Sequence, residues 1–120
     1  IYGGSQTAST LIANQVGIFC RDNVNSGNFT AYSTNSGGTQ TTLDLGVLPV
    51  AGQVYTLEIV GNKQNTEYRY FIDGVYKGRI TTNMPTATAV YVNALVIKSV
   101  GTTARTVKVS RIGATNVYAI

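Results

Sequence analysis

The feature that most constrains this chain is the Asp73-Gly74 pair, which lies between two stretches of strand-forming residues. An Asp-Gly pair tolerates the positive φ angles of a type I′ turn, whose twist matches that of the strands on either side. The flanking residues, 66–72 and 75–81, are rich in aromatic and β-branched side chains, which favour extended structure. The sequence therefore predicts a β-hairpin with a two-residue loop.

The length of this loop predicts which side chains lie opposite each other across the hairpin. A one-residue slip in this register would turn every side chain to the other face of the sheet. The predicted pairs are Ile72 with Val75, Phe71 with Tyr76, Tyr70 with Lys77, and Tyr68 with Arg79.

This register predicts one candidate binding surface, formed by Tyr68, Tyr70, Lys77 and Arg79 on a shared strand face. Aromatic rings beside cations can stack on sugar rings or planar groups, while the hydroxyl and guanidinium groups supply hydrogen bonds. The alternative is ordinary cross-strand packing, in which the Lys and Arg stems cover the rings. In that alternative, the core face of the hairpin comes from Phe71, Tyr76 and Ile80.

The rest of the sequence has the same strand-and-turn pattern. Only 12% of the 120 residues are charged and 43% are hydrophobic, which excludes a disordered chain. Short extended segments with turns between them predict an all-β fold, an antiparallel β-sandwich or jelly roll, with a small barrel as the alternative. Residues 1–14 are predicted to form an extended arm or connector, and residues 15–120 the β-sandwich domain. The predicted strands are 15–21, 29–33, 39–45, 54–60, 66–72, 75–81, 89–98, 105–112 and 117–120.

The titratable residues argue against catalysis. The chain has no His, so the commonest general base and the commonest metal ligand are both missing. A glycosidase needs two carboxylates at a fixed separation, and none of the five acids is spaced to give such a pair on one strand. We therefore expect no catalytic residue, no cofactor and no resident metal; a calcium ion held by Asp22, Asp44 or loop Asn side chains is the alternative. The five acids are Asp22, Asp44, Glu58, Glu67 and Asp73.

The cysteine, the net charge and the apolar runs of the sequence indicate which partners to expect. The single cysteine, Cys20, lies in an apolar run and is predicted to be a buried, inert hydrophobe. The formal net charge is +4, but the nine cations are spread along the chain, so we expect solvated strand faces and no nucleic-acid partner. Single-stranded nucleic-acid binding by a basic aromatic sheet is the alternative. The longest apolar run, 90–97, is much shorter than the roughly 20 residues of a membrane span, so no membrane association is expected.

Several motifs occur in an order that resembles a known family. These are Val-Tyr-Thr-Leu-Glu-Ile at 54–59, Tyr-Phe-Ile-Asp-Gly-Val at 70–75, Thr-Thr-Asn-Met-Pro-Thr at 81–86 and Gly-Thr-Thr-Ala-Arg-Thr-Val at 101–107. They resemble the concanavalin A-like (lectin/glucanase, laminin-G-like) jelly-roll domains of tailed-bacteriophage structural proteins, such as head-decoration, head-fibre and tail-fibre proteins. Residues 17–46 are compatible with the preceding strands of that fold.

The resemblance implies a function as well as a fold. It implies a non-enzymatic structural module on the virion surface, on capsid or fibre, that forms a homo-oligomer such as a trimer or docks on a capsid or fibre protein. The alternative is a carbohydrate-binding, lectin-like adhesin that contacts host-surface glycans through the aromatic and basic strand face. The chain departs from the family in two ways. Members with the whole sandwich usually carry several more N-terminal strands, so the resemblance implies that this sequence begins inside the fold. The acidic catalytic motif of the glucanase relatives does not occur in it.

Overall fold

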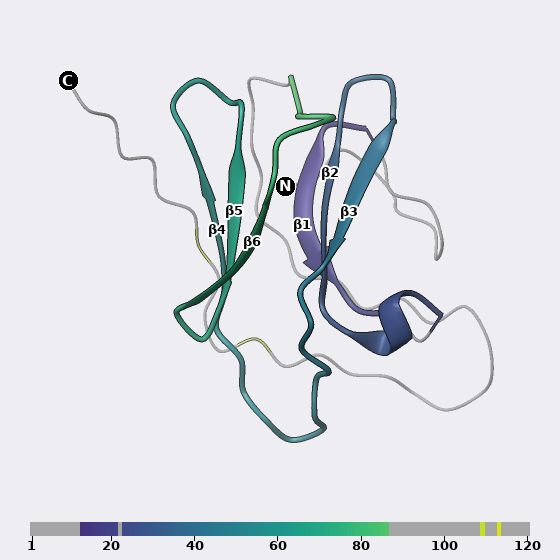
Figure 1. The fold of residues 1–120 in the computed structure, drawn as a ribbon, viewed down its shortest axis with the longest axis vertical. Coiled ribbons are helices and arrows are strands. Elements are labelled where there is room, and N and C mark those ends of the chain that lie inside the picture. The colour runs from purple at the N-terminus through teal and green to yellow at the C-terminus, as the bar shows by residue number, and fades with distance from the viewer. Residues whose placement is uncertain (1–12, 22, 87–108, 110–112, 114–120) are drawn as a thin grey trace.

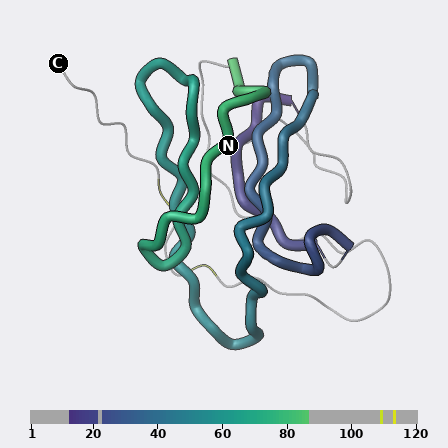
Figure 2. The backbone as a smooth tube through the Cα atoms, in the orientation of Figure 1, coloured from purple at the N-terminus to yellow at the C-terminus, as the bar shows by residue number. Residues whose placement is uncertain are grey.

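The computed structural model describes residues 13–21, 23–86, 109 and 113 (Figure 1). These residues form two antiparallel sheets of three strands each, which confirms the predicted all-β fold and its β-sandwich character (Figure 2). A short 3-10 turn, η1 (Asn25–Gly27), lies between the first two strands. The first sheet contains β1 (Gln15–Phe19), β2 (Thr30–Thr34) and β3 (Gln40–Asp44), and the second contains β4 (Leu57–Gly61), β5 (Tyr68–Ile72) and β6 (Val75–Ile80).

All six strands overlap the segments predicted from the sequence, and their ends differ by a few residues. The three later predicted strands, 89–98, 105–112 and 117–120, lie outside the described residues, as does most of the predicted arm. Asn14 is described, and its side chain ties the start of the domain to a distant loop. Its Oδ1 atom accepts a hydrogen bond from the backbone N–H of Thr86 at 2.9 Å.

The hairpin formed by β5 and β6 has the predicted turn. Asp73 has a φ of 50° and Gly74 a φ of 77°, as a type I′ turn requires. The turn is also tied to the segment before β4. Asp73 Oδ1 accepts a hydrogen bond from the Thr56 N–H at 2.8 Å, and the Asp73 N–H donates to the Thr56 carbonyl at 2.8 Å.

The register of this hairpin is only partly as predicted. Ile72 pairs with Val75 and Phe71 with Tyr76, which confirms the two pairs nearest the turn. The predicted pairs of Tyr70 with Lys77 and Tyr68 with Arg79 are wrong, because a bulge shifts the register between Tyr70 and Phe71 and leaves Lys77 as an extra residue. The observed pairs beyond the bulge are Tyr70 with Gly78, Arg69 with Arg79, and Tyr68 with Ile80.

Burial explains why the bulge forms. Uninterrupted pairing would place Lys77 and Arg79 beside the tyrosines on the inner face, where unpaired charges are costly. The extra residue moves the later residues of β6 to the opposite face of the sheet. Gly78 and Ile80 therefore take the inner positions, and Arg79 faces outward. Ile80 is indeed buried, whereas Arg79 is exposed.

The core lies between the two sheets. Its central side chain is Tyr70, which is 0% exposed and donates a hydrogen bond of 2.9 Å from its hydroxyl to the Tyr32 carbonyl of β2. The other buried hydrophobic residues are Phe29, Ala31, Leu45, Ile72 and Ile80.

Gly78 allows β6 to approach the first sheet closely. A Cβ atom at this position would lie 2.6 Å from Leu43 Cδ2, well inside van der Waals contact. Gly78 also has a φ of 150°, which residues with a side chain rarely adopt. A glycine inside a strand often marks such a close approach or a bulge, and here it is associated with both.

Candidate ligand-binding surface

The structure does not bring the four predicted binding residues onto one surface. Tyr68 and Tyr70 share a face, as predicted, but this face is turned toward the core. Tyr70 is fully buried, and burial raises the pKa of its hydroxyl above the usual value. Lys77 is the extra residue of the bulge, and Arg79 lies on the opposite face. Of the three alternative core residues, Phe71 and Tyr76 also face outward, whereas Ile80 is buried in the core.

The aromatic and basic residues of the opposite face form a different surface, here called the outer face. It consists of Glu67, Arg69, Phe71, Tyr76 and Arg79. Arg69 pairs with Arg79 and Phe71 with Tyr76, so all four side chains project from the same side of the sheet. Arg69, Phe71, Tyr76 and Arg79 line an open hollow of about 430 Å³.

Two aromatic rings line this hollow, those of Phe71 and Tyr76. The centroids of the Phe71 and Tyr76 rings are 5.7 Å apart, with an angle of 62° between the planes. This is the edge-to-face arrangement that aromatic pairs favour. Tyr76 is 51% exposed, so a ligand can reach its ring.

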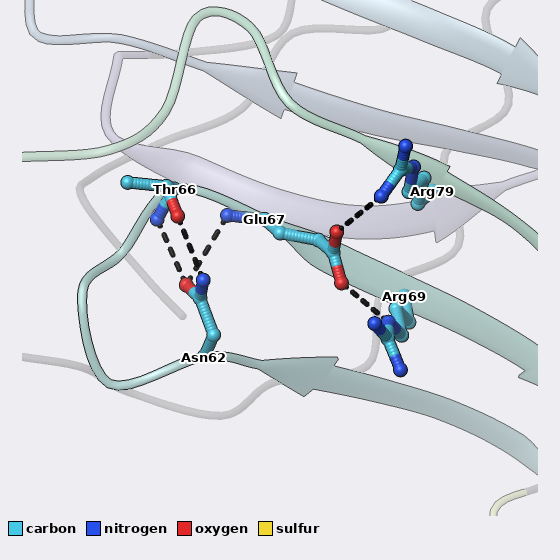
Figure 3. Close-up of polar contacts among 5 residues, drawn as sticks. All are labelled: Asn62, Thr66, Glu67, Arg69 and Arg79. Atoms are coloured by element: carbon cyan, nitrogen blue, oxygen red, sulfur yellow. Dashed lines mark hydrogen bonds and ion pairs between the residues drawn. The ribbon is translucent and has the colours of Figure 1, made fainter.

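Glu67 holds the guanidinium groups of Arg69 and Arg79 (Figure 3). Its Oε1 atom accepts a hydrogen bond from Arg69 Nε, and its Oε2 atom accepts one from Arg79 Nη1 at 2.8 Å. The side chains of Arg69 and Arg79 remain 56% and 58% exposed, whereas that of Glu67 is 15% exposed. The hydrogen bonds from Arg69 and then Arg79 hold the pKa of the Glu67 carboxyl below its usual value.

The turn before β5 fixes the position of Glu67. Asn62 Oδ1 accepts hydrogen bonds from the N–H groups of Thr66 at 2.8 Å and Glu67 at 3.2 Å (Figure 3). Asn62 Nδ2 donates to Thr66 Oγ1 at 2.7 Å. The carboxylate that holds both arginines therefore belongs to a turn with its own hydrogen-bond network.

A second hollow adjoins the first on the same sheet. It has a volume of about 350 Å³ and is lined by Val60, Gly61, Asn62, Glu67 and Arg69. Arg69 lines both hollows, so the outer face has two neighbouring hollows that share this residue.

The ion pairs of Glu67 are expected to make stability depend on pH. A carboxyl whose folded-state pKa is lowered stabilises the fold above its unfolded pKa, about 4.3, and this contribution disappears as pH falls through the lowered value. We expect the Tm of the wild type to exceed that of Glu67→Gln by no more than a few degrees near pH 6. This difference should shrink toward zero in thermal melts taken down to pH 2. A Tm difference that stays constant over this range would contradict the assignment.

The described carboxylates other than Glu67 show no catalytic pairing. Asp44 accepts hydrogen bonds from the Asn28 side chain and the Gly46 N–H, and Asp73 holds the hairpin turn. Glu58 is exposed on β4, and Asp22 lies outside the described residues. Among the residues described, no three His, Cys, Asp or Glu side chains gather where they could hold a metal ion.

Cys20 differs from the sequence prediction. It is exposed, not buried, because the strand ends at Phe19 and the chain leaves the sheet. Neighbouring groups nevertheless desolvate the thiol and raise its pKa to about 11. The thiol is therefore protonated at neutral pH, which disfavours nucleophilic chemistry.

Sequence reasoning missed Glu67, Arg69, Phe71 and Tyr76 as a surface. Two signals could have located it. Gly78 inside a strand points to a bulge, and strict alternation would have placed two cations in the core.

The comparisons with known proteins add no relative. No family model, curated protein or solved structure matches this chain. In the described part of the chain, no helix has the length and apolarity needed to cross a membrane.

Proposed function

We propose that this chain is a non-enzymatic structural module displayed on the surface of a tailed-phage virion, on the capsid or a fibre, with a jelly-roll fold. The sequence resemblance supports this role, because three of its motifs lie in or beside β4, β5 and β6. The observation that carries the proposal is that three of the described carboxylates are engaged in structural contacts. Asp44, Glu67 and Asp73 all make contacts that hold turns or arginines in place.

Strand β4 supports association with another chain. Among the described strands it pairs only with β5, so one of its edges has no strand beside it there. It also presents exposed aliphatic side chains, Leu57 and Val60, the latter 45% exposed. An edge of this kind favours pairing with a further strand. We propose that the module works as a homo-oligomer or docks through this edge on a capsid or fibre protein.

Sedimentation of the whole chain tests the homo-oligomer. We expect a mass above that of the monomer at micromolar concentration, and a shift to monomer in Val60→Lys, because edge lysines block strand pairing. Val50→Lys is the matched control, since Val50 is an exposed valine in the loop between β3 and β4, lies on no strand edge and should leave the mass unchanged. A wild-type protein that sediments as a stable monomer would contradict self-association.

A second candidate function is a carbohydrate-binding adhesin, favoured by the aromatic hollow of the outer face. Exposed rings can stack on the apolar faces of sugars, and the guanidinium groups beside them can bind hydroxyl or acidic groups. The volume of the hollow, about 430 Å³, falls within the range of small-molecule sites, about 300–1,000 Å³.

A glycan array separates the two candidates. Binding that is lost in Tyr76→Ala but kept in Val75→Ala would support the adhesin, because both residues are exposed neighbours and only Tyr76 lines the hollow. No signal from any glycan would favour the purely structural role.

A further inference from the structure

We infer that the outer face is built for an acidic oligosaccharide, with a ligand carboxylate on the donors of Arg69 and Arg79 that Glu67 leaves free and a sugar ring on Phe71 and Tyr76. This inference rests on the proposed carbohydrate-binding function and names its ligand class.

The guanidinium groups retain most of their donors. Each Arg has five N–H groups in a planar fork that matches a carboxylate. Arg69 uses Nε and Arg79 uses Nη1 toward Glu67, so the other nitrogens have no partner shown among the described residues. Glu67 thus orients two donor groups that are more than half exposed. Donors oriented before binding lose less conformational entropy when a ligand arrives.

The local charge favours a ligand with few negative charges. Around the hollows, Arg69, Arg79 and Glu67 together carry one net positive charge, which a single ligand carboxylate complements. Glu58 lies opposite Phe71 on the same face and lines neither hollow, and with it the four charged side chains sum to zero. Two carboxylates on this face disfavour a polyphosphate chain, because single-stranded nucleic acids require a continuous positive groove.

The shared position of Arg69 favours more than one sugar unit. The aromatic hollow and its polar neighbour are both lined by this residue. A first unit can stack on the rings, while a second reaches Asn62 and the edge of β4. We therefore expect a trisaccharide to bind more tightly than a monosaccharide of the same type.

Calorimetric titration of the whole chain tests this inference. The probes are a trisaccharide with one galacturonic acid and two galactose units, the neutral galactose trisaccharide and a thymidine decanucleotide. We expect the acidic sugar to bind about tenfold more tightly than the neutral one, as charge-assisted hydrogen bonds imply. Arg79→Gln should remove this preference, and Arg79→Lys should weaken it, because Lys keeps the charge but loses the fork.

Lys63→Gln is the matched control, because it lowers the net charge by the same amount at an exposed turn residue outside both hollows. Its affinity for the acidic sugar should stay within about twofold of the wild type, since single exposed charges contribute little. A melt of each variant checks that it is folded.

The outcomes distinguish the inference from the function on which it rests. Equal affinity for both sugars, lost in Tyr76→Ala, would overturn the acidic ligand but keep the carbohydrate-binding function. Equal losses in Arg79→Gln and Lys63→Gln would also overturn it, because net charge alone would then explain binding. Binding of neither sugar would end the carbohydrate proposal itself. Tighter binding of the decanucleotide, falling steeply with salt, would overturn the inference in favour of nucleic acid.

Discussion

Replacing Tyr70 with alanine is expected to lower the free energy of unfolding by about 3–5 kcal/mol, the range found for truncating a large buried aromatic side chain. Tyr70 is fully buried between the sheets, so its loss leaves a cavity that the rigid strands cannot close. The substitution also removes the hydroxyl that donates to the Tyr32 carbonyl. Urea unfolding followed by circular dichroism measures the change.

Two further variants separate packing from hydrogen bonding. Tyr70→Phe keeps the ring and should cost about 1 kcal/mol, the usual contribution of one hydrogen bond. Tyr76→Ala removes an exposed ring and should change stability by much less than Tyr70→Ala. Similar losses from Tyr70→Ala and Tyr76→Ala would contradict the assignment of inner and outer faces.

Replacing Gly78 with alanine is expected to cost about 1–3 kcal/mol, the range for overpacked cores. The added methyl group would lie 2.6 Å from Leu43 Cδ2, and the φ of 150° adds backbone strain. Thermal or urea unfolding measures this loss.

A double-mutant cycle tests whether the cause is contact between the sheets. Leu43→Ala removes the atom that the new methyl group would meet, so the two changes together should cost less than the sum of the single losses by about 1 kcal/mol. Gly37→Ala is the mild control, because its new methyl group meets only Asn35 Oδ1 at 3.4 Å and its φ is not positive. Strict additivity at Gly78 and Leu43 would contradict the close approach of the two sheets.

Much of the fold follows from local sequence signals. Asp73-Gly74 locates the hairpin because few residue pairs tolerate two positive φ angles. The six described strands follow from β-branched and aromatic residues between turns. Their pairing order also agrees with short connections, since sequential strands usually lie side by side.

The candidate surface was harder to predict because it depends on one extra residue. Alternation correctly placed Tyr68 and Tyr70 on a shared face, but it could not show that this face is the core. The bulge at Lys77 reverses the facing of every later residue of β6, so Arg79 moves from the tyrosines to Arg69. The role of Glu67 depends on the Asn62 turn and on both strands of the hairpin, and a sequence pattern does not contain that geometry.

The most direct test of this account is the register of β5 against β6, measured by cross-strand nuclear Overhauser effects between backbone protons. We expect contacts from Tyr70 to Gly78 and from Arg69 to Arg79, with Lys77 outside the regular pairing. Contacts from Tyr70 to Lys77 and from Tyr68 to Arg79 would contradict it, because the aromatic and basic outer face would then not exist.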